Sequence, residues 1–246
     1  MLVKLIAYTP DPEKVTAVAA YTSISKEGPT EKMKTLDEKR SKNVLRHVVG
    51  YGHHSVIEHA SFTFAVEGCS RACTHQLVRH RIASYTQQSQ RYVTFDELDY
   101  VTPPKIENNE NAKKIFDETM RELANAYKKL VDMGIPAEDA RYVFPNAAKS
   151  NIVITMNARE LLHFFRLRCC LRAQWEIREL ANRMLLEVKR VAPTIFENAG
   201  PSCVQLGYCP EGKFTCGKFK KVVEAYKSLD EDGGNGIDRL LKLGED

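Results

Sequence analysis

The chain has 246 residues, of which 43% are hydrophobic and 28% charged. This composition is typical of a globular protein, and the length is enough for one large domain or two small ones. The formal net charge of +4 comes from 36 basic against 32 acidic residues spread along the whole chain. Net charge alone therefore does not indicate a nucleic-acid-binding protein.

Membrane and secretory segments are not expected. No apolar run approaches the roughly 18 residues that a membrane-spanning helix needs, and the opening MLVKLIAYTPDPEK is too short and too soon interrupted to be a signal peptide. The seven cysteines are an odd number and include an adjacent pair, which is not the pattern of a secreted disulfide framework. We expect a cytoplasmic protein whose thiols are mostly reduced.

The first half of the chain contains three clear structural patterns. Residues 4–8 (KLIAY) have the apolar, β-compatible character of an opening strand. Residues 36–49 place apolar side chains at helical spacing and are followed by Gly50 and Gly52, so a helix should end just before His53. Residues 60–68 (ASFTFAVEG) alternate large apolar with small or polar side chains, which predicts a strand with one buried face.

Ser70 is placed to cap a helix over residues 70–81 (SRACTHQLVRHR). Because three and four residues make about one helical turn, Gln76, Arg79 and His80 should then point to the same side.

The second half is dominated by helical patterns. Residues 112–133 carry an apolar stripe that ends at Gly134 and Pro136, which predicts an amphipathic helix. A further helical pattern runs from Asn157 to Pro193, with Glu160 at the third helical position as in a capping box and a bend or break expected near residues 169–172.

The segment RHRIASYTQQSQRY at 79–92 has the composition of an anion-binding site. Guanidinium groups, a serine hydroxyl and amides would together satisfy a phosphate monoester. The chain contains neither GxxxxGK[ST] nor GxGxxG, so phosphate binding by side chains is expected. The alternative is that Arg79, Arg81 and Arg91 only solvate a helix end and pair with surface acids.

Two other segments carry reactive side chains. In FRLRCCLRAQWEIRE, Arg168 and Arg172 are four residues apart on an otherwise apolar helix face, so at least one should meet a buried anion or polar ring. GHHSVIEH at 52–59 lacks the HExxH pattern, and Cys203, Cys209 and Cys216 lack an evident fourth ligand. We therefore expect no metal site, although a zinc site in either segment stays an alternative.

Five blocks together identify a family resemblance. RHR followed by seven residues and Ser89 resembles the signature of the flavin-dependent thymidylate synthases. GHHSVIEH, ARYVFP at 140–145, MNAREL at 156–161 and FRLRCCLRAQWEI at 165–177 resemble that family's other blocks, in the same order. The resemblance implies a single α+β domain, with a sheet flanked by long helices, that assembles as a homotetramer with active sites between subunits.

The resemblance also implies a reaction. The family methylates dUMP to dTMP, takes the carbon from 5,10-methylenetetrahydrofolate, and releases tetrahydrofolate. The hydride comes from FADH2, which NADPH regenerates, so FAD takes part in the chemistry. No covalent enzyme nucleophile on the uracil is needed, and neither nucleic acid nor a membrane is an expected partner.

The same resemblance assigns residues to the two ligands. For FAD and the co-substrates that meet it, the residues are His53, Ser55, Glu58, Arg79, His80, Arg81, Ile82, Gln87, Asn157, Arg159, His163 and Arg172. For dUMP, they are Gln76, Arg79, Gln87, Gln88, Ser89, Gln90, Arg91, Arg141 and Arg168. Arg168 is the expected catalytic residue, whose permanently charged guanidinium favours ionisation of the uracil N3.

Some positions differ from the family pattern. Relatives carry Asn and His where this chain has His163 and Arg172, and some carry Glu at Gln87. We expect a catalytic domain over residues 1–228, with a cysteine-rich extension at 197–220, and a charged, mobile tail over residues 229–246.

Two other functions fit parts of the sequence. A thymidylate synthase that uses a cysteine nucleophile would need a Pro-Cys-His motif, which the chain lacks, and Ser89 has no neighbouring base. A nucleotide- or nucleic-acid-binding module without catalysis would use the same arginines on phosphates, with Tyr85 and Tyr92 stacking on bases. The amide-rich QQSQ stretch favours a compact pocket for one nucleotide instead.

Overall fold

The computed structural model describes residues 1–92, 98–230 and 236–244. The chain divides into two compact units. Unit 1 consists of Met1–Leu2, Val66–Arg79 and Tyr85–Val153, and unit 2 consists of Val3–Ala65, His80–Ser84 and Ile154–Asp246. The chain passes from one unit to the other within each of the four strands of the sheet, and once more between Arg79 and His80. The fold is one α+β domain, as the sequence predicts.

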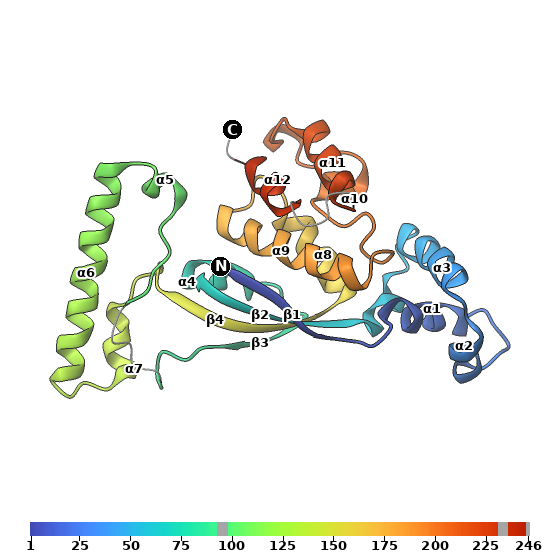
Figure 1. Cartoon of the computed structure of the whole chain (residues 1–246), viewed down its shortest axis with the longest axis horizontal. Helices are drawn as coiled ribbons and strands as arrows, with labels where there is room; N and C mark the ends of the chain where they lie inside the picture. The colour runs from blue at the N-terminus through green and yellow to red at the C-terminus, as the bar shows by residue number, and fades with distance from the viewer. Residues whose placement is uncertain (93–97, 231–235, 245–246) are drawn as a thin grey trace. The chain divides into compact units, whose positions relative to one another are not determined.

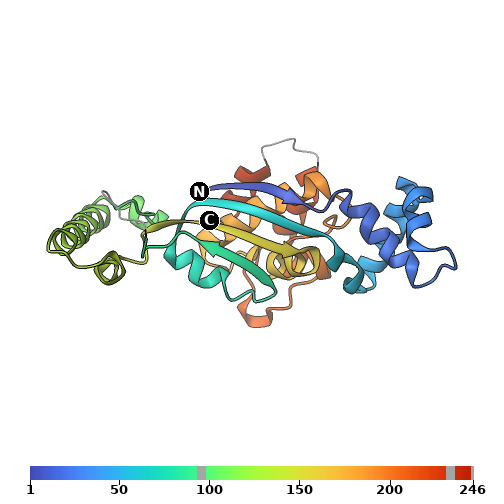
Figure 2. The same cartoon turned by 90° about the horizontal axis from the view of Figure 1, so that it is seen from below.

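The sheet has four antiparallel strands in the order β1-β2-β4-β3, shown in Figures 1 and 2. The strands are β1 (Leu2–Tyr8), β2 (Ser61–Ser70), β3 (Ala83–Gln87) and β4 (Lys149–Asn157). The strands predicted at 4–8 and 60–68 are confirmed as β1 and β2. Phe62 and Phe64 are fully buried, as the alternation in that stretch indicates.

Sequence patterns did not predict β3 and β4. The strand β3 reads ASYTQ and is half-buried or exposed along its whole length, because it lies at the edge of the sheet. Its weak apolar alternation gave no strand signal. By contrast, β4 does alternate, with Ile152, Ile154 and Met156 buried.

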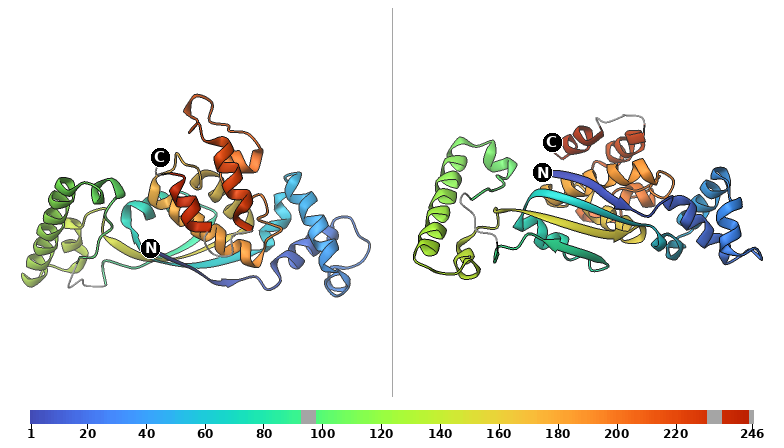
Figure 3. Two further views of the ribbon diagram at one scale, coloured as in Figure 1. Left: turned by 45° about the horizontal axis from the view of Figure 1, so that its top comes forward. Right: turned by 60° about the horizontal axis from the view of Figure 1, so that its bottom comes forward.

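Helices α8 (Ala158–Arg168) and α9 (Trp175–Val191) lie over the strands of unit 2 (Figures 1 and 3). Aromatic rings fill the layer between them: Phe196 meets Phe62 of β2 at 5.5 Å and Phe165 of α8 at 6.0 Å between ring centroids, both edge-on. Such edge-to-face contacts are favourable beyond the area that they bury. The core of unit 2 therefore sits between this helix pair and the strands.

The predicted break in the long helical pattern is confirmed. The side chain of Asn157 caps α8 by accepting a hydrogen bond from the Glu160 amide at 2.9 Å. After Arg168 the chain leaves helical geometry, and Gln174 caps α9 through the amides of Glu176 and Ile177. Each new helix therefore begins where a side-chain oxygen satisfies amides that have no partner within the helix.

The remaining helices of unit 2 form two groups. Helices α1 (Pro12–Thr22), α2 (Pro29–Thr35) and α3 (Glu38–Gly50) pack together beside the 3-10 helix η1 (His54–His59). The helix predicted at 36–49 is confirmed as α3, capped by Asp37 through the Arg40 amide. The second group is α10 (Ser202–Leu206), η3 (Gly212–Phe214), α11 (Phe219–Lys227), η4 (Ser228–Asp230) and α12 (Gly236–Lys242).

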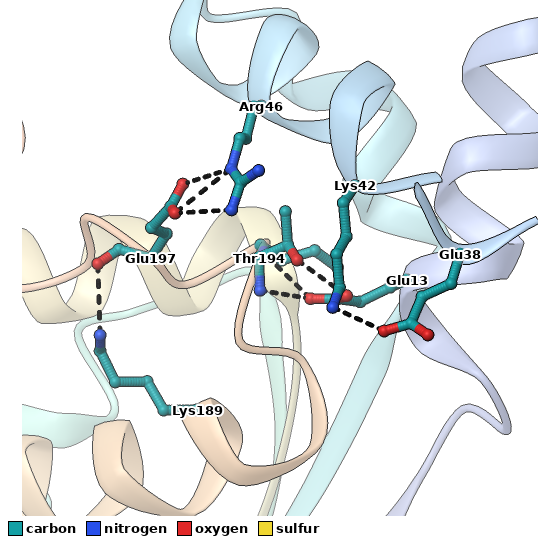
Figure 4. A network of polar contacts seen from close by, with 8 residues as sticks. Glu13, Glu38, Lys42, Arg46, Lys189, Thr194 and Glu197 are labelled. Atoms are coloured by element: carbon teal, nitrogen blue, oxygen red, sulfur yellow. Dashed lines mark hydrogen bonds and ion pairs between the residues drawn. The ribbon is translucent and has the colours of Figure 1, made fainter. Parts of the chain in front are cut away.

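A polar network ties the first helices to the segment that follows α9 (Figure 4). The Glu13 carboxylate accepts hydrogen bonds from the Thr194 amide, from the Thr194 hydroxyl at 2.9 Å and from the Ile195 amide at 3.2 Å. Arg46 of α3 binds the Glu197 carboxylate through Nε and Nη2, at distances of 3.0 to 3.2 Å. Glu13 thus satisfies two backbone amides at a turn without regular structure.

The cysteine-rich extension is anchored through α11. The buried Tyr226 hydroxyl donates to the Asn182 amide oxygen at 2.6 Å, and it lies 3.3 Å from the carbonyl oxygen of Cys169. In the predicted tail, Leu240 of α12 is buried, and α12 packs against α9. That residues 229–246 as a whole form a mobile tail stays a prediction, since residues 231–235, 245 and 246 lie outside the described part.

Unit 1 contains α4 (Arg71–Leu77), α5 (Pro104–Glu107), α6 (Glu110–Asp132), α7 (Ala137–Ala140) and the 3-10 turn η2 (Arg141–Val143). The amphipathic helix predicted at 112–133 is confirmed as α6, the long helix in Figures 1 and 3. Its apolar stripe meets neighbouring aromatic rings, with Tyr127 and Phe144 4.4 Å apart.

The helix predicted at 70–81 is shorter than expected. Ser70 does cap it, through the Cys73 amide, but α4 ends at Leu77. The Tyr85 hydroxyl donates to the Leu77 carbonyl oxygen at 3.0 Å, which satisfies one of the acceptors left open at the helix end. The expectation that Gln76, Arg79 and His80 share one helix face is therefore wrong: Arg79 is exposed, whereas His80 is buried.

Candidate active site

A cavity of about 440 Å³ opens in unit 2 beside the N-terminus of α8. Its lining comes from η1, from the segment that precedes β3, from α8 and from α10. The lining residues are His54, Glu58, Ile82, Asn157, Arg159, Glu160, Leu162, His163, Arg166 and Gln205. Five of them, namely Glu58, Ile82, Asn157, Arg159 and His163, belong to the predicted flavin-contacting set.

The mouth of this cavity combines charge with an apolar surface. Arg159 Nη1 donates to Glu58 Oε1 at 2.5 Å, and both side chains are exposed. The side chain of Ile82 is also exposed, at 68% of its surface. Asn157 uses its oxygen as the cap of α8, so its amide nitrogen is the group that it can offer to a ligand.

A buried cluster of charged and aromatic side chains lies next to the cavity. Arg168 Nε donates to His80 Nε2 at 3.0 Å, and the His80 ring packs edge-on against Phe164 at 4.9 Å. On the other side of the ring, His80 Nδ1 lies 3.4 Å from Glu160 Oε1. The predicted catalytic arginine and the histidine of the RHR motif are therefore direct partners.

Burial sets the protonation of this cluster. Loss of hydration, reinforced by the nearby charge of Arg168, lowers the pKa of His80 to about 4. Burial raises the pKa of Glu160, because the charged carboxylate loses hydration. The pKa of His163 is lowered by burial and by the charges of Arg166 and Arg168. His80 is therefore neutral at pH 7 and can accept a hydrogen bond from Arg168.

Besides His80, Arg79 and Gln87, four residues of the predicted flavin set do not line this cavity within the described structure. His53 just before η1, Ser55 within η1 and Arg81 just before β3 are all exposed. Arg172 follows α8 and lines a different, much smaller cavity in the cysteine-rich part of unit 2. Their assignment to FAD stays a prediction.

The predicted dUMP residues lie in unit 1, apart from Arg168. Gln87 donates its amide to the hydroxyls of Thr74 and Ser150, both at 3.1 Å, so its side chain is held by α4 and β4. The Gln88 amide donates to the Asn151 carbonyl at 2.8 Å, and the Ser89 hydroxyl accepts from the Arg91 amide at 3.1 Å. The QQSQR stretch is therefore held by hydrogen bonds that fix its backbone.

Three guanidinium groups surround the end of this stretch. Arg71 Nη2 donates to the buried Gln90 side chain at 3.3 Å, and Arg91 binds Glu138 through Nε at 3.0 Å and Nη2 at 2.9 Å. Arg141 Nε donates to the carbonyl oxygen of Glu138 at 3.1 Å. Burial and the positive charge of Arg141 lower the pKa of Arg71, so this excess of positive charge favours a bound anion.

The other two residues of this set sit at the end of α4. Gln76 is half-buried and its amide reaches the Ala72 carbonyl at 3.4 Å. Arg79 is exposed just beyond the helix. Their assignment to the nucleotide stays a prediction.

The metal alternatives gain no support from the described residues, among which no group of three or more His, Cys, Asp or Glu is arranged to hold an ion. The small cavity near Arg172 is lined by Cys170, Cys203, Cys209 and Cys216, and burial raises the pKa of Cys203 to about 11. In the described chain the cysteines form no disulfide bonds.

Comparison with known proteins decides the family. Residues 4–194 match the family model described as thymidylate synthase complementing protein. This range includes β2, β3 and β4, every cavity-lining residue except Gln205, and the arginines of both sites. The chain belongs to this family. Among its relatives, proteins called flavin-dependent thymidylate synthase from Clostridium tetani and Geobacter sulfurreducens are 52% and 53% identical over 240 and 231 residues.

Each of these alignments covers nearly the whole of this chain and of the relative. They include 91% of this chain and 96% of the Clostridium tetani protein, and 93% and 99% for Geobacter sulfurreducens. A protein of the same name from Pyrococcus abyssi is 47% identical over 236 residues, which are 92% of this chain and 97% of that protein. The family resemblance that five sequence blocks indicate is therefore confirmed, with alignments that cover more than nine-tenths of the chain.

Sequence patterns do not identify two residues that lie in these sites. Glu160 was interpreted only as part of a capping box, yet its carboxylate turns toward His80. Arg71 was interpreted only as part of a helix start, yet it joins the arginine cluster of unit 1. For Glu160 a signal did exist, because a carboxylate on the apolar side of a helix needs a buried partner.

Proposed function

We propose that this chain methylates dUMP to dTMP. The carbon comes from 5,10-methylenetetrahydrofolate, which leaves as tetrahydrofolate, and the C5 hydrogen of uracil leaves as a proton. Bound FADH2 supplies the hydride that turns the methylene into a methyl group, and NADPH returns two electrons to FAD. The observation that carries the proposal is the pairing of Arg168 with His80 beside the cavity, in a chain of this family.

The residues around the cavity suit a flavin dinucleotide. Arg159 and Arg166 provide guanidinium groups for a diphosphate, and the exposed side chain of Ile82 provides an apolar surface for a flat ring. Asn157 adds an amide donor that its capping role leaves available. His163 lines the same cavity, which supports its place in the flavin site even though relatives carry Asn there.

The arginine cluster of unit 1 suits the phosphate of dUMP. Arg71, Arg91 and Arg141 bring three positive charges, of which Glu138 balances one. Gln90 and the backbone turn at Ser89 add neutral groups beside them. A phosphate monoester with about two negative charges would neutralise the remaining excess.

Arg168 would act on the base of dUMP. Its Nε–H donates to His80, and this hydrogen bond orients the plane of the guanidinium, a group that carries only donors. Donors fixed beside the uracil N3 stabilise the negative charge that develops when N3 ionises. Because His80 is neutral at pH 7, it accepts this hydrogen bond and does not repel the arginine.

We also propose that the enzyme is a homotetramer whose active sites take residues from more than one subunit, and that it works in the cytoplasm. The absence of disulfide bonds among the described cysteines supports a reducing compartment. Within the described residues, no helix is both long and apolar enough to span a membrane.

Removing the proposed catalytic guanidinium tests this function. In Arg168→Ala, dTMP formation should fall by about a hundredfold to a thousandfold while FAD stays bound, since that is the usual effect of removing one preorganised electrostatic donor. Turnover is measured as dTMP produced from dUMP, methylenetetrahydrofolate and NADPH, and FAD by its visible absorbance. Arg183→Ala is the matched control, because Arg183 pairs with Glu179 on α9, away from the cavity.

Two outcomes would contradict the proposal. Wild-type turnover by Arg168→Ala would remove the role of that arginine. A colourless protein that takes up no FAD, makes no dTMP and loses oligonucleotide affinity steeply with added salt would instead be a nucleic-acid-binding module.

A further inference from the structure

The carboxylate of Glu160 is buried next to the proposed catalytic pair, and none of the roles above uses it. Glu160 keeps only 6% of its surface exposed, although it lies in the first turn of α8. Its backbone amide is bound by Asn157, while its side chain points to His80, with Oε1 3.4 Å from Nδ1. Burying a carboxylate costs free energy unless a hydrogen-bond donor or a positive charge is paired with it.

The position of the proton on His80 follows from donor and acceptor rules. A guanidinium has only donors, so the His80 Nε2 that Arg168 Nε approaches at 3.0 Å has to be the ring nitrogen without a proton. The proton of the neutral ring is then on Nδ1, the nitrogen that faces Glu160. A carboxylate at that place favours this tautomer over the one protonated on Nε2.

We propose that Glu160 is a positioning residue that acts on Arg168 through His80. The carboxylate keeps the proton of His80 on Nδ1, Nε2 stays an acceptor, and the Arg168 guanidinium is held with its two Nη groups directed away from His80. The inference rests on the proposed function for the role of Arg168, but the proton position on His80 can be tested without any turnover.

Other charged and titratable groups surround this chain of contacts. On α8, they are His163, whose ring centroid lies 5.6 Å from that of His80, and Arg159 and Arg166 on the cavity lining. From η1, His54 and Glu58 face the same cavity. Because the Glu160 carboxylate lies 3.4 Å from His80 Nδ1, it is close enough to favour one tautomer of the ring.

The first experiment measures the tautomer directly. Imidazole ¹⁵N chemical shifts of the FAD-loaded protein distinguish a ring protonated on Nδ1 from one protonated on Nε2. In the wild type, His80 should be protonated on Nδ1, and its resonances are assigned as those that are missing from His80→Gln. In Glu160→Gln the amide can turn its NH2 group to Nδ1, so the Nε2–H form should become populated.

The second experiment measures the consequence for the reaction. Glu160→Gln should lower kcat by about tenfold or more, the usual effect of removing a partner that orients a functional side chain, while FAD content stays constant. Glu160→Asp keeps the charge and should recover part of the loss. Glu176→Gln is the matched control, because Glu176 is a buried carboxylate in the first turn of α9 whose amide is also held by a capping side chain.

A wild-type His80 that is protonated on Nε2, or a Glu160→Gln enzyme with wild-type kcat and an unchanged His80 tautomer, would overturn the inference. A loss of kcat that Glu176→Gln shows equally would also overturn it, since the effect would then come from removing any buried carboxylate. If the wild type makes no dTMP, the proposed function fails, and the ¹⁵N measurement still decides the proton position.

Discussion

The buried imidazole of His80 makes the stability of the fold depend on pH, in addition to its place beside Arg168. Its folded pKa of about 4 lies below the value of 6.5 for an ordinary histidine, because the charged ring would lose hydration and meet Arg168. As pH falls, the unfolded chain takes up this proton before the folded one does. The contribution of neutral His80 to the free energy of unfolding is therefore fully present above pH 6.5, and it is lost as pH falls from 6.5 toward 4.

His80→Gln should reduce this pH dependence. Between pH 7 and pH 4, the free energy of unfolding of the wild type should fall by about 2–3 kcal/mol more than that of the variant, from the size of the pKa shift. Urea unfolding at a series of pH values measures the difference. His59→Gln, which replaces an exposed histidine, should keep the wild-type profile, and parallel profiles for wild type and His80→Gln would refute the expectation.

Single residues also show where sequence reasoning reached its limit. Family resemblance identifies both Arg168 and His80. It does not predict that they are in contact, because they are 88 positions apart in the sequence. Glu160 has a local explanation as a capping residue, which hid its long-range partner. Arg71 gave no signal, since the pKa shift that marks it depends on burial and on Arg141.

Among the contacts between elements, the Glu13 carboxylate differs from the exposed ion pairs around it. It accepts from the Thr194 and Ile195 amides and from the Thr194 hydroxyl, and so joins α1 to the turn that follows α9 (Figure 4). Its neighbour Arg46 makes a bidentate pair with Glu197, yet both of these side chains remain largely exposed. Water competes with that pair, so it should contribute little.

Glu13→Ala should therefore cost far more stability than Arg46→Ala. The first change leaves backbone amides without their acceptor and should lower the free energy of unfolding by about 2 kcal/mol, whereas the second should lower it by about 0.5 kcal/mol. Chemical denaturation at pH 7 compares the two variants. Equal losses would mean that the contact at Glu13 is no stronger than a surface ion pair.

The elements that sequence patterns predicted are those whose signal is local. Helix α6 has an apolar stripe and α8 has a cap, and both can be recognised within about twenty residues. The strand β3 lies at the sheet edge, where neighbouring strands and not its own side chains decide the structure. The helix expected at 70–81 ended early because Tyr85, beyond its end, satisfies the Leu77 carbonyl.

In the whole chain, most residues of the predicted flavin set belong to unit 2, and all residues of the predicted dUMP set except Arg168 belong to unit 1. The cavity proposed for flavin and Arg168 belong to unit 2, and the arginine cluster proposed for the phosphate belongs to unit 1. Large apolar side chains are exposed in both, among them Tyr142 and Met133 in unit 1 and Tyr51 in unit 2. Subunit contacts would bury such side chains, in keeping with the proposed tetramer.

If each active site takes its residues from more than one subunit, two inactive variants should restore each other. Arg91→Ala would disable the cluster proposed for the phosphate, and Arg168→Ala would remove the guanidinium proposed to act on the base. In randomly mixed tetramers, a site has both parts intact with a chance of about one in four, so coexpression should give about a quarter of wild-type activity.

The mixed enzyme is purified through a different tag on each variant, and its mass should be about 112 kDa, four times that of the 27.9 kDa chain. Two differently tagged copies of Arg168→Ala serve as the control and should give no activity. If each site were built within one chain, every site in the mixture would carry one of the two changes, and the mixed enzyme would be as inactive as the control.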